Sequence, residues 1–138
     1  MNVLGIGTEI TECPRIGKMI EQHGELFLRR VYTDREIRFC QAKKRALEHF
    51  AGHWAAKEAI VKAIGMGWSK ELCWTDIEIR ALAGGRTSVH VRGGAKDLTV
   101  SRGIRDILIS ISHCRTYATA YAMALGDAKS VEPEKFAE

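Results

Sequence analysis

The sequence predicts an α+β fold with a mainly antiparallel sheet and a long central helix. Two observations favour it. Strand-like segments with period-two alternation follow one another directly at residues 75–92 and again at 106–125, and such neighbours pair as antiparallel hairpins. Segments with helical spacing of apolar residues lie between these hairpins and an N-terminal strand, which is typical of helices packed on a sheet. The length of 138 residues fits one domain.

The N-terminal half is predicted to hold one strand and three helices. Thr33 and Glu36 have the spacing of a capping box, which places the start of the second helix at Asp34. Gly65 follows the third helix, and glycine is the usual helix terminator. The predicted elements are a strand over 2–10, a helix over 14–30 with a break near Gly24, a helix from Asp34, and a helix over 48–64.

The C-terminal half is predicted to hold two strand pairs and a short helix. The first pair turns at 83–86, the helix covers 94–102, and the second pair turns at 113–116. One face of the last strand is made of alanines, which usually allow something to pack closely: Ala118, Ala120, Ala122 and Ala124. We expect residues 1–126 to form the domain and residues 127–138 to form a mobile tail.

Charge is distributed unevenly. The net charge is +4, with a net of −2 in residues 127–138, +6 in the remainder and +5 in residues 28–45 alone. A basic body can indicate nucleic acid, an anionic cofactor or an acidic partner, and it can also be a solvated face. The four cysteines form no C-x-x-C pair, which makes a zinc site or a disulfide framework unexpected and fits a reducing cytoplasm. No segment has the pattern of a signal peptide or a membrane span.

The third helix carries charge beside its predicted core face. On a helical wheel Lys57 lies within the apolar sector, and Glu58 and Lys62 form an i, i+4 pair at its edge. One interpretation is a surface salt bridge with a lysine whose stem is buried and whose head reaches water. The other is a helix edge that lines a site for a phosphate-bearing ligand, with the carboxylate holding a hard cation. The apolar residues of the sector are Phe50, Trp54, Val61 and Ile64.

The first strand contains two glycines on one face. Val3, Gly5 and Gly7 precede Glu9 on that face, and glycines within a strand mark a bulge or the close approach of a ligand or another backbone. The pattern lacks the third glycine of a dinucleotide-binding fingerprint, so that class of site is excluded.

A third candidate lies where the penultimate strand ends. Ser112 and His113 stand at this end, as a turn serine and a surface histidine or as site residues. The glycine pattern of a nucleophile elbow is missing, so serine hydrolase chemistry is rejected.

Together these three stretches resemble the holo-acyl carrier protein synthases, the short bacterial class of 4′-phosphopantetheinyl transferases. The motifs are G-I-G-x-acid-I at 5–10, W-x-x-K-E-A-x-x-K-A-x-G at 54–65 and S-x-S-H-x-x-x-Y-A-x-A at 110–120. The resemblance runs in order over residues 2–125. It implies a transfer of 4′-phosphopantetheine from coenzyme A to a serine of an apo acyl carrier protein, in support of fatty acid biosynthesis, with release of adenosine 3′,5′-bisphosphate.

The resemblance also implies roles for single residues. Glu9 and Glu58 stand at the positions of the magnesium ligands and, with Lys62, are the implied catalytic residues. The residues implied to contact coenzyme A are His53, Lys57, Lys62, Ser112 and His113. Family members assemble as homotrimers with coenzyme A between subunits, an arrangement that an alanine-faced strand suits. The general base stays open between a metal-bound water and a carboxylate.

Two positions depart from the family pattern. Glu9 replaces the usual aspartate, and its extra methylene shifts the carboxylate. Because magnesium tolerates poor octahedral geometry badly, we expect the backbone to retreat, Glu9 to bind through a water, or the metal affinity to be lower. His53 stands where arginine is common, which weakens one phosphate contact near neutral pH.

The partner surface is implied as well. Arg15 and Lys18 are expected to dock the acidic carrier, although Glu21 and Glu25 make this surface less basic than is usual in the family. The competing class is a basic cytoplasmic binding module without catalysis, for nucleic acid or an acidic protein. Against nucleic acid, aromatic residues do not interleave with the basic run. We therefore expect neither a nucleic acid nor a membrane partner.

Overall fold

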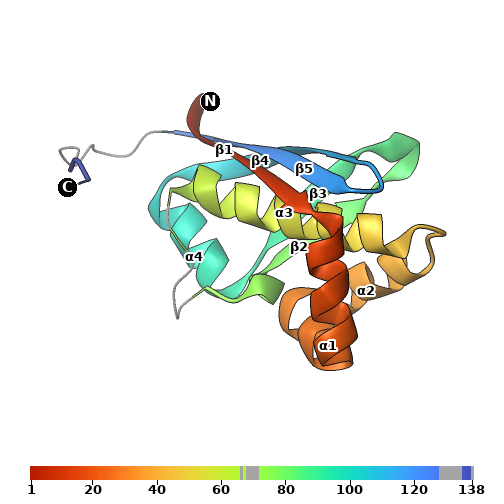
Figure 1. Ribbon diagram of the computed structural model, residues 1–138. Helices are drawn as coiled ribbons and strands as arrows, with labels where there is room; N and C mark the ends of the chain where they lie inside the picture. The colour runs from red at the N-terminus through yellow and green to blue at the C-terminus, as the bar shows by residue number, and fades with distance from the viewer. Residues whose placement is uncertain (66, 68–71, 128–134, 138) are drawn as a thin grey trace.

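The computed structural model describes residues 1–65, 67, 72–127 and 135–137. Helices and strands follow the predicted order (Figure 1). The elements are β1 (Asn2–Glu12), α1 (Cys13–Val31), α2 (Asp34–Gln41), α3 (Ala46–Ile64), β2 (Ile77–Ala81), β3 (Thr87–Val91), α4 (Gly93–Ser101), β4 (Ile104–His113) and β5 (Tyr117–Gly126), with 3₁₀ turns at Trp74–Asp76 and Ala83–Gly85.

The strands form two antiparallel sheets. The larger has the order β1-β5-β4, so the chain's last strand lies between its first and its penultimate one, and β2 pairs with β3 in a separate hairpin. Thr8 lies opposite Tyr121, which in turn lies opposite Ser110. The α+β architecture with antiparallel pairing is therefore confirmed, and β1 is an edge strand whose outer side is open to a site.

The predicted start of α2, break in α1 and end of α3 are confirmed, whereas α3 begins at Ala46 and not at the predicted residue 48. The Thr33 side chain accepts a hydrogen bond from the backbone N–H of Glu36, and the Glu36 carboxylate accepts one from the backbone N–H of Thr33, which together form the capping box. Gly24 interrupts α1 with a φ of 51°, and Gly65 ends α3 with a φ of 89°. Both angles lie in the left-handed region that favours glycine.

The glycines of β1 allow α3 to lie directly against the strand. A Cβ built on Gly7 would lie 2.0 Å from the carbonyl oxygen of Ala59, and one built on Gly5 would lie 2.0 Å from that of Ala63. The close approach of another backbone thus accounts for both glycines. Since Gly5 meets the later helical residue and Gly7 the earlier one, strand and helix run in opposite directions.

The alanine face of β5 also lies against α3. All four of its alanines are buried, and three of them join the core cluster that contains Ala59 and Ile60 of α3. The expectation that this face suits contact between subunits is therefore wrong. The chain's own helix covers it.

One side-chain assignment in β1 is also wrong. Alternation placed Val3 on the face of Gly5 and Gly7, but the pairing with β5 shifts its register between Val3 and Gly5. Leu4 consequently packs against the core, whereas Val3 is largely exposed. The irregularity reverses the alternation at the start of the strand.

The opposite face of the larger sheet carries exposed apolar side chains. Figure 1 shows α3 along one side of this sheet, and the exposed residues point away from it. They are Ile6, Ile10, Leu108, Tyr117 and Tyr121. Among the described residues no helix is long and apolar enough to cross a bilayer. Most of the predicted tail, residues 128–134 and 138, lies outside the described part of the chain.

Candidate active site

The edge of the larger sheet brings two of the predicted site residues together, and a third lies one helical turn away on α3. Glu9 lies near the end of β1, and its Oε2 is 3.7 Å from Nζ of Lys62 on α3. The same ammonium donates a hydrogen bond of 3.0 Å to the carbonyl oxygen of Thr8. Glu58 precedes Lys62 by one helical turn on the same side of α3 and is partly buried. The antiparallel packing of β1 on α3 therefore places both carboxylate-bearing segments at one open edge.

This edge has the donor set that magnesium prefers. Mg²⁺ is bound by one or two carboxylates, and waters and substrate phosphates complete its octahedron. No group of three or more His, Cys, Asp or Glu side chains with metal-binding placement exists among the described residues, so a cage made only of protein ligands is not formed there. Two carboxylates beside a lysine fit a cation shared with a phosphate substrate.

Lys57 does not belong to this edge. Its side chain is wholly buried, and its ammonium lies 2.7 Å from Oε1 of Glu36. The remaining donors bind the carbonyl oxygens of Val31 at 2.6 Å and Trp74 at 3.1 Å. The three ammonium protons are thus used within the fold. This buried placement of the Lys57 ammonium fits neither a contact to a coenzyme A phosphate nor exposure of the ammonium to water.

A cavity of 400 Å³ lies between α3, the start of β3 and the end of β4. We call it the histidine cavity. It is defined here by Phe39, Lys43, His49, His53, Arg86 and His113, which line it together with smaller residues. His53 and His113 were both predicted to contact coenzyme A, and the fold brings them to one space. Its three histidines, beside the positive charges of Lys43 and Arg86, make this cavity suited to an anion.

Each of those two histidines is held by a buried carboxylate. Nδ1 of His53 lies 2.7 Å from Oε2 of Glu36, and Nδ1 of His113 lies 2.9 Å from Oε1 of Glu48. A carboxylate only accepts, so each Nδ1–H must donate. The hydrogen bond from His113 lowers the pKa of Glu48. By contrast, burial and then the charge of His113 lower the pKa of His49.

Sequence reasoning missed the two carboxylates that pair with histidines of this cavity. Glu36 was visible only as a helix cap, and Glu48 lay at the start of a predicted helix with no motif around it. No local sequence signal indicates that Glu36 pairs with His53 or that Glu48 pairs with His113. Glu48 and His113, for example, are 65 positions apart in the chain. Only the packing of α3 on β4 joins them.

Ser112 lies on the other side of the sheet from His113. Gly52 of α3 faces Ile111 and His113, and adjacent residues of a strand point to opposite faces. The side chain of Ser112 is accordingly exposed on the face away from α3. The structure does not bring Ser112 into the histidine cavity of its own chain.

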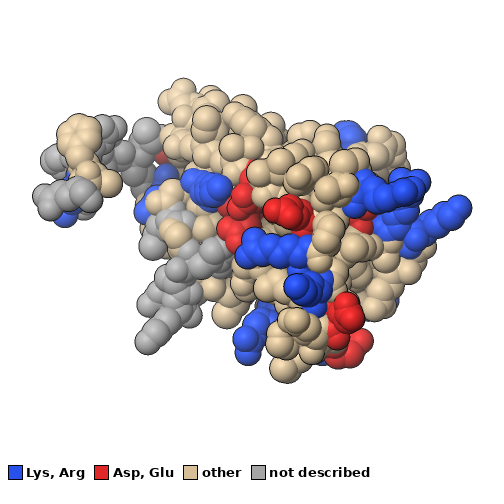
Figure 2. Space-filling model, viewed as in Figure 1, with Lys and Arg blue, Asp and Glu red and all other residues tan. Residues whose placement is uncertain are grey.

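Arg15 and Lys18 are exposed on α1. Figure 2 shows Lys and Arg side chains over α1 and over the segment between α2 and α3, with acidic side chains also present over α1. An apolar groove of 300 Å³ lies beside the same helix. It is lined by Met19, His23, Leu26, Phe27, Arg30, Val31, Trp54 and Trp74.

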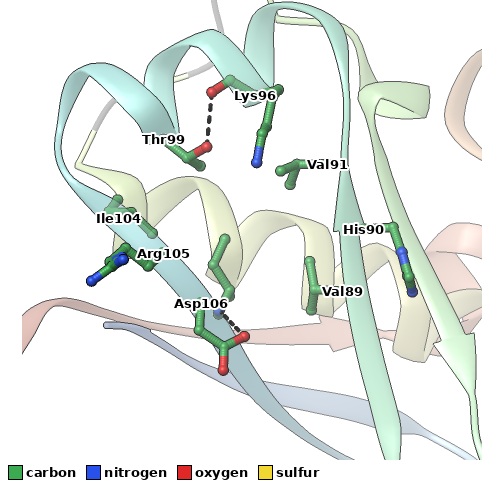
Figure 3. A pocket seen from close by; sticks show the side chains of 9 residues that line it. Val89, His90, Val91, Lys96, Thr99, Ile104, Arg105 and Asp106 are labelled. Atoms are coloured by element: carbon green, nitrogen blue, oxygen red, sulfur yellow. Dashed lines mark hydrogen bonds between the residues drawn. The ribbon is translucent and has the colours of Figure 1, made fainter. Parts of the chain in front are cut away.

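Another cavity, of 230 Å³, lies between β3, α4 and β4 (Figure 3). Lys96 extends into it from α4, and Thr99 donates a hydrogen bond to the carbonyl oxygen of Lys96. None of the predicted site residues lines this cavity. It is separate from the edge of β1 and from the histidine cavity.

Comparison with known proteins places this geometry in a family. Two curated relatives named holo-[acyl-carrier-protein] synthase align over most of both chains. The relative from Koribacter versatilis is 43% identical over 118 residues, covering 86% of this chain and 94% of its own. The relative from Rhodopirellula baltica is 42% identical over 123 residues, covering 89% and 98%.

Solved structures agree with the fold. The holo-[acyl-carrier-protein] synthase of Neisseria meningitidis has a TM-score of 0.82 at 26% identity and covers 90% of this chain and 99% of its own. The Helicobacter pylori enzyme, solved in complex with coenzyme A, has a TM-score of 0.77 at 30% identity and covers 87% and 99%. The alternative of a binding module without catalysis finds no support in these comparisons. The family model described as the 4′-phosphopantetheinyl transferase superfamily matches residues 5–123, and the chain therefore belongs to that superfamily.

Proposed function

We propose that this chain is a holo-acyl carrier protein synthase that transfers 4′-phosphopantetheine from coenzyme A to a serine of an apo acyl carrier protein. The observation that carries the proposal is the edge formed by β1 and α3. There a carboxylate and a lysine from motifs far apart in the sequence, Glu9 and Lys62, come within 3.7 Å. Family membership supports the reaction, because the relatives are named for it.

Glu9 and Glu58 are the proposed ligands of a magnesium ion. When bound, the ion neutralises charge on the pyrophosphate oxygens of the donor. Lys62 supplies a cation at the same edge, and its half-exposed side chain can leave Glu9 to meet a phosphate oxygen. The residues of this edge thus position and neutralise the diphosphate, which is the main requirement of phosphoryl-type transfer.

The histidine cavity is the proposed site of the nucleotide end of coenzyme A. Its cations Lys43 and Arg86 and the rings of His53 and His113 can meet phosphate oxygens. The Phe39 ring stacks on His53, with centroids 5.7 Å apart, and offers an aromatic surface beside the charges. Lys57 joins α3 to α2 through its ion pair with Glu36 and is not proposed as a ligand. Ser112 stays a predicted contact that only a neighbouring subunit could use.

The proposed assembly is a homotrimer with sites between subunits. Its support is the exposed apolar face of the larger sheet, since contiguous apolar surface on a small domain marks an interface. Tyr121 lies on the central strand β5 of that face, and Ile10 lies on the edge strand β1. Substitution of either by glutamate should yield monomers in analytical ultracentrifugation, whereas an unchanged trimer would reject this face.

The carrier is proposed to dock on α1, where Arg15 and Lys18 offer positive charge beside an apolar groove. A cytoplasmic location remains a prediction, supported by four cysteines that are all free thiols.

One assay tests the proposed function. The protein is mixed with coenzyme A, magnesium and an apo acyl carrier protein, and the carrier is weighed by mass spectrometry. The expected result is the mass increase of one phosphopantetheine group, abolished by a chelator. Unchanged mass with several carriers under saturating coenzyme A would favour a binding module.

A further inference from the structure

We propose that Glu48 is a positioning residue that fixes the ring of His113 through Nδ1 and turns its Nε2 edge toward the histidine cavity, as a donor to an anionic group. This inference rests on the proposed function only for the identity of that anion, the nucleotide end of coenzyme A. Glu48 itself does not touch the ligand.

Glu48 is itself held firmly. It lies in the first turn of α3 and is almost wholly buried. Its two oxygens are both used, because Oε1 accepts from Nδ1 of His113 at 2.9 Å and Oε2 lies 3.5 Å from Nη1 of Arg45. A carboxylate fixed on both sides fixes the ring that donates to it.

The opposite edge of the ring lies beside Gly52, in the wall of the histidine cavity. Nε2 and Cδ2 lie opposite Nδ1, and a Cβ built on Gly52 would lie 3.9 Å from Cδ2 of His113. Gly52 lines the histidine cavity. With Nδ1–H engaged by Glu48, a proton on Nε2 makes the ring a cation that can donate to an anion there.

In the proposed complex, negative groups face the His113 ring from two sides. Glu48 faces it from α3, and a bound anion faces it from the cavity. The positive or titratable groups that oppose it are His49, whose ring centroid is 4.7 Å away, and the more distant Lys43, His53 and Arg86 across the cavity. Burial lowers the pKa of His49, so its ring opposes His113 little near neutral pH.

A purely structural role is the competing explanation. A buried ion pair between α3 and β4 could hold the sheet to the helix and serve nothing else. The two explanations differ in a double-mutant cycle, because a residue that acts through His113 loses its effect once His113 is gone.

The experiment measures the affinity for adenosine 3′,5′-bisphosphate by calorimetry in wild type, E48A, E48Q, H113Q and E48A/H113Q. Loss of a charge-assisted hydrogen bond is expected to weaken binding about tenfold in E48A. The effect is expected to be smaller in E48Q, whose amide oxygen still accepts from Nδ1. In the H113Q background the added E48A change should weaken binding less than about twofold. Equal losses in both backgrounds, or no binding by wild type, would overturn the proposal.

Nuclear magnetic resonance of the ring gives a readout that depends on neither ligand nor catalysis. The neutral His113 ring should carry its proton on Nδ1 in wild type and shift toward Nε2 in E48A. An identical tautomer in both would also overturn the proposal. E78Q is the matched control, since Glu78 is a partly buried carboxylate paired with Arg80 outside the cavity, and it should change neither readout. Carrier modification is scored separately, so its failure rejects the proposed function and leaves the ring measurement to decide the role of Glu48.

Discussion

The ammonium of Lys57 lies 2.7 Å from the carboxylate of Glu36, and neither side chain has any exposed surface. Burying two charges is expensive unless every donor and acceptor is satisfied. Here Glu36 also accepts from His53 and from the backbone of Thr33. The network joins α2 to α3 in the interior and leaves no buried side-chain N or O atom without a partner among the described residues.

Lys57→Met should therefore act on stability. Removing one partner leaves the carboxylate of Glu36 uncompensated, and breaking such a buried pair costs about 3–5 kcal/mol. Urea unfolding measures this loss in the free energy of unfolding. Lys62→Met, on the same helix but half-exposed, is the matched control and should cost less than about 1 kcal/mol. A Lys57→Met protein that keeps its stability but has a raised KM for coenzyme A would contradict this structural role and support a contact between Lys57 and coenzyme A.

The same network should make the fold sensitive to acid. Burial alone would raise the pKa of Glu36, but the hydrogen bond from His53 and the charge of Lys57 lower it below its usual 4.5. The unfolded chain therefore binds a proton at higher pH than the native one, so the free energy of unfolding falls as pH drops below 4.5 toward the native pKa. Unfolding measured between pH 6 and 3 should show this fall, and Glu36→Gln should lessen it.

Gly7→Ala should destabilise the packing of α3 on β1. The new methyl group would lie 2.0 Å from the carbonyl oxygen of Ala59, and backbone cannot move aside cheaply. We expect a loss of about 1–3 kcal/mol or more, with reduced activity because Glu9 and Lys62 separate. Gly67→Ala is the control, since no atom of the described residues lies within 4 Å of a Cβ built there. Equal thermal stability of the two variants would contradict the close-approach explanation.

Local chemistry predicted the elements well. The capping box at Thr33, the break at Gly24 and the terminator Gly65 each act through their own backbone, so sequence spacing sufficed. The start of β1 was predicted correctly, but the face of Val3 was not, because the register shift between Val3 and Gly5 depends on pairing with β5. The alternation of apolar residues along β1 does not show how this strand pairs with β5, which comes from the other end of the fold.

Of the candidate site, only the residues that belong to the sequence motifs were predictable. Glu9 and Lys62, for which the resemblance implied catalytic roles, lie 3.7 Å apart. The helical wheel placed Lys57 in the core sector without naming the carboxylate that makes its burial tolerable. That carboxylate, Glu36, sits on another helix. Likewise Glu48 reaches His113 only through tertiary packing. Ion pairs between distant segments are set by the fold and leave no periodic signal.

Reversing the charge of Arg15 and Lys18 should weaken the carrier interaction. Both side chains are exposed on α1, and rim charges act mainly on association rate. The apparent KM for carrier should rise, that for coenzyme A should not change, and the effect should fade as salt screens it. Lys96→Glu, at the cavity of Figure 3, changes the net charge as much as either single reversal and is the control for each of them. An effect confined to coenzyme A would reject the docking surface.

The final prediction separates the two carboxylates proposed to hold magnesium. Glu58→Gln keeps the size of the side chain and removes its charge from a position fixed by α3. The rate of transfer should fall by about 10²-fold or more, the order seen when a key electrostatic group is lost. Glu9 lies on a strand pressed against α3 through Gly7 and carries one methylene more than the family's usual aspartate. Glu9→Asp should accordingly be tolerated or bind magnesium more tightly, while Glu9→Gln should lose activity.

Initial rates over a magnesium titration measure all three variants. Glu12→Gln, an exposed change at the last residue of the same strand, is the matched control and should behave as wild type. Equal damage by Glu9→Asp and Glu9→Gln would show a site rebuilt around the longer carboxylate, because the Lys62 contact at 3.7 Å then requires the reach of glutamate. Full activity of Glu58→Gln at low magnesium would instead show that the helix carboxylate does not hold the metal, leaving Lys62 as the group on α3 that meets the diphosphate.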